Sequence, residues 1–94
     1  MTTNSSARDA QAIWTAECAK CHGADGKGQT RTGRMRHLKD LTAPDVKAAL
    51  KNEAMFETIR KGLKNEAGIT LMKPIQYASD EEVKSLIQLI RGLK

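Results

Sequence analysis

Two cysteines and a histidine fall within five consecutive residues near the start of the sequence. Cys18 and Cys21 are separated by two residues, and His22 follows directly, so the segment reads C-A-K-C-H. Thiols three positions apart project from one helical turn, so both can engage the same group. The imidazole that follows can supply a metal ligand. We therefore expect a cofactor or metal site at this turn.

The C-x-x-C-H spacing is the attachment signature of c-type haem. In that chemistry each thiol adds to a vinyl group of one porphyrin, and the histidine offers an imidazole nitrogen to the iron. A disulfide between Cys18 and Cys21 would close too small a loop to constrain the unfolded chain much. A chain of 94 residues with three aromatic side chains also gains from a large apolar cofactor that completes its core.

Three other interpretations of the motif stay open. A thioredoxin-like C-x-x-C lies at a strand-to-helix turn of a βαβ pattern, whereas this pair ends a predicted helix in a chain without strand alternation. A zinc site needs four ligands, which Cys18, Cys21, His22 and His37 could provide, but zinc would leave the rest of the sequence unexplained. The third interpretation is a chance occurrence without chemistry.

The cysteine pair requires a helix, and the pattern predicts one from about Ala7 to Cys21, capped by Ser6, after frayed residues 1–6. Gly23 and Gly26 end it, and the chain from Ala24 to Thr42 reads as a loop. The apolar stripe of this first helix has helical spacing and consists of Ala10, Ile13, Trp14, Cys18 and Cys21.

Three further helices are predicted. One begins near Pro44, and a second spans about Glu53 to Lys61, with Gly62 as its stop. Residues 64–78 read as irregular. The last helix begins after Ser79, which forms an S-x-x-E capping box with Glu82. Its apolar residues recur at three-to-four spacing, namely Val83, Leu86, Ile87, Ile90 and Leu93. The predicted fold class is all-α.

From about residue 7 to residue 93 the sequence resembles the class I c-type cytochromes of bacterial type. The similarity is carried by Ala10, Trp14 and Cys18 in the first helix, C-H-G-A-D-G over 21–26, D-L-T over 40–42, M-K-P over 72–74 and S-D-E-E-V over 79–83. It implies a single monohaem domain over 1–94, with the N- and C-terminal helices packed together and shorter helices and loops wrapping one haem. The sequence lacks the family's proline between Gln29 and Gly33, so a different carbonyl must accept the Nδ1 proton of His22.

The same resemblance implies that Met72 is the second axial ligand, because the family places a methionine in the loop before the last helix. The other internal methionines suit this role less. Met55 falls on an amphipathic helix, where it would fill the core, and Met35 is too close to His22 in sequence to reach the opposite haem face easily. His37 is the rival ligand, but its basic neighbours indicate a solvated loop.

The chain carries 16 basic and 11 acidic residues, a formal net charge of +5. This surplus favours an acidic redox partner, whereas nucleic-acid binding is disfavoured because no aromatic residues interleave with the basic cluster. The sequence contains no run of 18 apolar residues, so no membrane span is predicted. The start lacks the pattern of a signal peptide, yet covalent haem implies export, so we expect a periplasmic protein that is a monomer or a domain of a larger one.

Two functions are therefore expected to compete. The first is one-electron transfer through a covalently attached haem c with histidine and methionine ligation, in an electron carrier that is not itself an enzyme. The alternative is a haem that binds small ligands, as a gas sensor or haem enzyme, after release of a labile Met72. No acid–base pair for catalysis is evident in the sequence.

Overall fold

The computed structural model describes residues 10–94, and its first helix runs through residue 22. It consists of residues 10–13, the π-helical segment η1 (Trp14–Cys18) and the helix α2 (Ala19–His22). The predicted end at Cys21 is correct to one residue. The predicted start at Ala7, its cap and the frayed segment 1–6 lie outside the described residues.

The segment predicted as a loop over 24–42 contains a short helix, α3 (Arg31–Met35), which corrects that prediction. Thr30 caps it, because its side chain accepts a hydrogen bond of 2.8 Å from the backbone N–H of Gly33. The helix ends at Met35, Arg36 is its C-cap, and His37 then adopts a left-handed conformation with φ of 56°. The next helix, α4 (Pro44–Ala49), begins where it was predicted.

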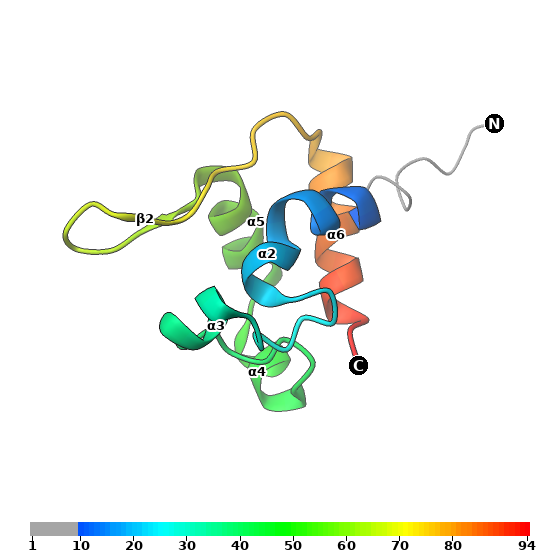
Figure 1. Cartoon of the computed structure of the whole chain (residues 1–94). Helices are drawn as coiled ribbons and strands as arrows, with labels where there is room; N and C mark the ends of the chain where they lie inside the picture. Colours follow the sequence, from blue (N-terminus) through cyan, green and yellow to red (C-terminus); the bar gives the residue numbers. More distant parts are fainter. Residues whose placement is uncertain (1–9) are drawn as a thin grey trace.

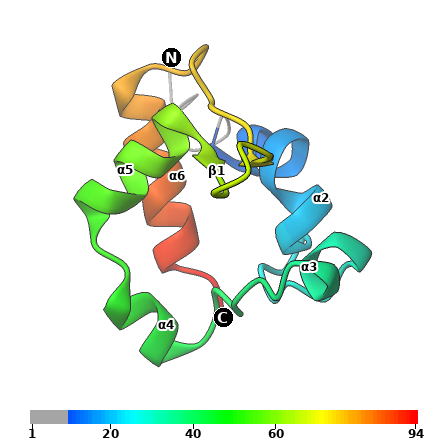
Figure 2. The same ribbon diagram turned by 90° about the vertical axis from the view of Figure 1, so that its left-hand side faces the viewer.

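The two longest helices, α5 (Asn52–Lys61) and α6 (Asp80–Arg91), also match the prediction and pack against each other (Figures 1 and 2). Gly62 ends α5 with φ of 74°, a conformation that favours glycine. Ser79 and Glu82 form the complete capping box at the start of α6.

Between these helices the chain forms a short antiparallel hairpin, where an irregular segment was predicted. Its strands are β1 (Leu63–Lys64) and β2 (Thr70–Met72), with Leu63 opposite Met72 and an irregularity in the pairing after Leu63. The hairpin projects from the helical body (Figure 1). Strands of two and three residues are too short to show a period of two in the sequence.

The core is apolar and is built by the first helix, α5, α6 and the segment before α6. Its most deeply buried side chains, Trp14, Val83 and Leu86, come from the first and last helices. The N- and C-terminal helices thus contribute to one core cluster, as expected for the fold. Figure 2 shows α2 and α3 on one side of the molecule and α5 and α6 on the other.

Candidate functional site

Helix formation brings Cys18, Cys21 and His22 together on one turn, as the sequence predicted. Neither cysteine is in a disulfide; Cys18 is buried, whereas Cys21 and His22 are half-buried. The helix stops immediately after His22, because Gly23 has φ of 85° and turns the chain away. Two free thiols and an imidazole thus remain available at the end of α2.

Hydrogen bonds from the following loop hold this turn in place. The Thr30 hydroxyl donates to the carbonyl of Cys21 at 2.6 Å, and the Gly28 N–H donates to the carbonyl of His22 at 2.8 Å. On the other side, the Trp14 indole donates to the carbonyl of Ala24 at 3.3 Å. The Trp14 and His22 rings lie with their centroids 6.0 Å apart, so the indole also packs beside the imidazole.

The cysteine environment does not suit thiolate chemistry. Burial raises the pKa of Cys18 to about 12, with smaller contributions from the charges of Glu17 and Cys21. A redox nucleophile must be a thiolate, which this environment disfavours. Among residues 10–94 no group of three or more His, Cys, Asp or Glu side chains is placed to hold a metal ion, and His37 is exposed at the end of α3. The redox-thiol and zinc interpretations therefore lose support.

The His22 imidazole is prepared to act as a ligand. Burial lowers its pKa, so the ring is neutral and retains a lone pair. Its Nδ1 is buried without a hydrogen-bond partner, which holds for no other buried side-chain nitrogen or oxygen in the described part of the chain. The carbonyl that was expected to accept the Nδ1 proton is therefore not found there, which corrects that prediction. Two unpaired thiols and a neutral imidazole on one turn fit the donor set that haem c requires.

The four possible second ligands differ in their surroundings. Met72 lies in β2, half-buried and packed against the core. Met55 is 8% exposed within the core, which confirms its predicted role as a core residue, whereas Met35 is 72% exposed. His37 is also exposed. Of these four side chains, Met72 alone combines partial burial with a place in the loop region before α6.

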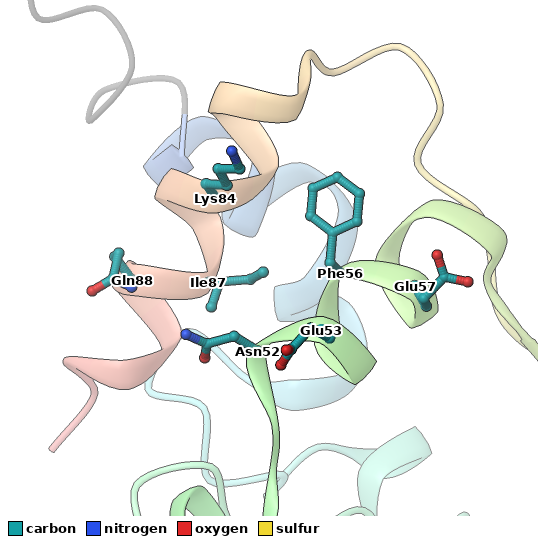
Figure 3. A pocket seen from close by; sticks show the side chains of 7 residues that line it. All are labelled: Asn52, Glu53, Phe56, Glu57, Lys84, Ile87 and Gln88. Carbon is teal, nitrogen blue, oxygen red and sulfur yellow. The ribbon is translucent and has the colours of Figure 1, made fainter.

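A groove of about 580 Å³ lies elsewhere, between α5 and α6 (Figure 3). Phe56 and Ile87 supply its apolar surface, and the polar residues around it are Asn52, Glu53, Glu57, Lys84 and Gln88. None of the candidate site residues lines this groove. It is therefore separate from the site at the end of α2.

Comparison with known proteins identifies the family. The model of the family described as cytochrome c oxidase, cbb3-type, subunit III matches residues 5–90. The chain belongs to this family. No curated protein sequence matches the chain.

Two solved structures are similar to this cytochrome domain over nearly its whole length. The KustC0563 c-type cytochrome has a TM-score of 0.72 and 26% identity over 92% of this chain and 98% of its own. A mutant of KustC0563 has a TM-score of 0.70 and 26% identity over 92% of this chain and 99% of its own. The expected class I cytochrome c fold is thereby confirmed.

Membership in the family establishes the general function. The chain is a haem-based electron-transfer domain and an electron carrier rather than an enzyme by itself, and its family implies a haem c cofactor. The comparisons do not favour the alternative of a haem that binds small ligands. Within residues 10–94, no helix combines the length and apolar character needed to cross a membrane.

Proposed function

We propose that residues 1–94 form one monohaem domain that transfers single electrons through a haem c bound by Cys18, Cys21, His22 and Met72. The observation that carries the proposal is the pair of unpaired thiols beside a half-buried imidazole on one helical turn. The haem supplies an iron that changes its oxidation state by one electron. The protein residues hold it and set its potential.

Each residue has a separate part in this proposal. Cys18 and Cys21 would form the thioether bonds to the haem, since both thiols are free and share one helical turn. His22 binds iron through Nε2, because its Nδ1 is buried. Met72, in β2, would supply a thioether as the second iron ligand, and such a ligand would raise the reduction potential. Trp14 keeps the imidazole oriented by packing beside it.

The partner proposal rests on charge. The exposed basic residues of the first helix, the following loop and the hairpin region are Lys20, Lys27, Arg31, Arg34, Arg36, Lys39, Lys64 and Lys73. Such a surplus steers an acidic redox protein toward the site by long-range attraction. We further propose a periplasmic or otherwise exported location, consistent with covalent haem attachment, without membrane insertion or nucleic-acid binding by this chain.

Covalent attachment is tested on the purified holoprotein. Haem should stay with the chain in acid acetone, and Cys18→Ser and Cys21→Ser should each remove one thioether bond. Haem that is fully extracted from the unaltered protein would contradict the proposal.

Axial ligation is tested with Met72→Ala. The variant should lose the weak sulfur-to-iron absorption band of the oxidised protein and have a lower reduction potential, because the thioether is gone. Met55→Leu is the matched control, since Met55 is a core methionine, and it should keep both properties. Unchanged spectra in Met72→Ala, with changes in a Met35 or His37 variant instead, would reject the assignment.

A further inference from the structure

The segment that carries Met72 is held from several elements at once. Gly62 lies against it so closely that a Cβ there would meet the carbonyl oxygen of Met72 at 2.5 Å. The Ile75 N–H donates to the carbonyl of Ile59 in α5 at 2.8 Å. The Arg36 guanidinium, which follows α3, donates from Nη1 to the carbonyl of Leu71 in β2 at 2.8 Å.

The hydrogen bond of Arg36 connects the two halves of the candidate haem site through α3. Arg36 is the C-cap of α3, and the N-cap Thr30 accepts from the Gly33 N–H at 2.8 Å and donates to the carbonyl of Cys21 at 2.6 Å. Leu71 directly precedes Met72. Two hydrogen bonds and one short helix therefore connect the cysteine–histidine turn to the backbone of the methionine strand.

The hairpin itself gives β2 little support. Its pairing extends over two pairs of residues and is irregular between them. Hairpins of this size are marginally stable in water, so contacts from outside the hairpin decide how firmly β2 is held.

We propose that Arg36 is a positioning residue for the axial thioether, which it holds in place through the carbonyl of Leu71. The inference rests on the proposed ligation by Met72. Removing a hydrogen bond that exists only while β2 is in place should raise the population of the detached state by about threefold to tenfold. The bond is solvent-exposed, so its effect is expected to fall within this range rather than above it.

Titration of the oxidised holoprotein with imidazole measures this population. Imidazole binds after the thioether has left, so its apparent affinity rises in proportion to the detached fraction. Arg36→Gln should therefore bind imidazole about threefold to tenfold more tightly than the unaltered protein. Arg34→Gln is the matched control, because Arg34 is an exposed arginine of the same helix and donates to Gln29 instead of the hairpin. It removes the same charge and should change the affinity less than twofold.

Met72→Ala in the same titration separates the two proposals. If Met72 is the ligand, this variant binds imidazole more tightly, and adding Arg36→Gln to it has no further effect. If Met72→Ala raises the affinity while Arg36→Gln does not, or if both glutamine variants raise it equally, the positioning role is wrong and the ligation stands. If Met72→Ala changes neither the affinity nor the sulfur-to-iron band, the ligation fails and the positioning role fails with it.

Discussion

Gly33→Ala should destabilise the fold strongly, because α3 packs on the cysteine–histidine turn with no room for a side chain. A Cβ at residue 33 would lie 2.2 Å from the carbonyl oxygen of Gly28 and 2.9 Å from that of Cys21. Both obstacles are backbone atoms. Carbon and oxygen normally approach to somewhat more than 3 Å, so α3 would have to move by roughly 1 Å.

The magnitude follows from two contributions. Overpacking a tight interior site costs about 1–3 kcal/mol. Displacing α3 also strains the two hydrogen bonds of Thr30, to Cys21 and from Gly33, each worth about 1 kcal/mol. We therefore expect a loss of about 2–4 kcal/mol in the free energy of unfolding. That is a large share of the total for a domain of this size, which is of the order of 5–10 kcal/mol.

Guanidinium-induced unfolding of the holoprotein measures this loss, with Gly92→Ala as the matched control. A Cβ at residue 92 would have its nearest neighbours at 3.6 Å, and Gly92 has an ordinary negative φ of −86°. Alanine there should leave the stability unchanged or raise it by up to about 1 kcal/mol, since it restricts the unfolded chain. Equal stability of the two alanine variants would show that the packing of α3 on the turn is not tight.

Three other predictions concern capping, acid and salt. Ser79→Ala removes the capping-box acceptor of α6 and should lower the free energy of unfolding by about 1 kcal/mol, which thermal unfolding can measure. Hydrogen bonds from Thr42 hold the pKa of Asp40 in the folded protein below its ordinary value of 3.8. The stability that these bonds contribute is therefore fully present above pH 3.8 and is lost as the pH falls through the pKa of the folded protein. Asp40→Asn should therefore flatten the acid limb of the stability curve; an unchanged limb would contradict this. Electron transfer with an acidic partner, followed by stopped flow, should slow with salt and slow more in Lys27→Glu than in Lys84→Glu, whereas rates that ignore salt and both changes would leave the basic surface with no steering role.

The helices whose ends are encoded locally were predictable from the sequence. Ser79 and Glu82 are three residues apart and cap each other's backbone groups, so the start of α6 needs no tertiary information. Gly62 likewise ends α5 through its own left-handed backbone.

Elements held by contacts between distant segments were missed. Helix α3 has a glycine at its centre and few apolar residues, and it depends on the hydrogen bond from Thr30 to the turn at Cys21. The hairpin depends on Gly62 and on Arg36, which is 35 positions from Leu71. No local sequence pattern predicts contacts between residues so far apart in the chain.

The residues of the candidate site differ in the same way, since some are identified by local spacing and one is not. Cys18, Cys21 and His22 are contiguous, so their spacing alone pointed to the cofactor, and the helix needed only to place them on one turn. Met72 was predicted from a family resemblance, and its spacing from the cysteines carries no equivalent signal. How firmly a methionine from β2 can serve as a ligand depends on contacts such as that of Arg36 with Leu71. The kind of cofactor thus follows from a local motif, whereas the strength of the methionine ligation depends on contacts between distant segments. Two related chains can therefore share the C-x-x-C-H motif and still differ in how readily an outside ligand binds the iron.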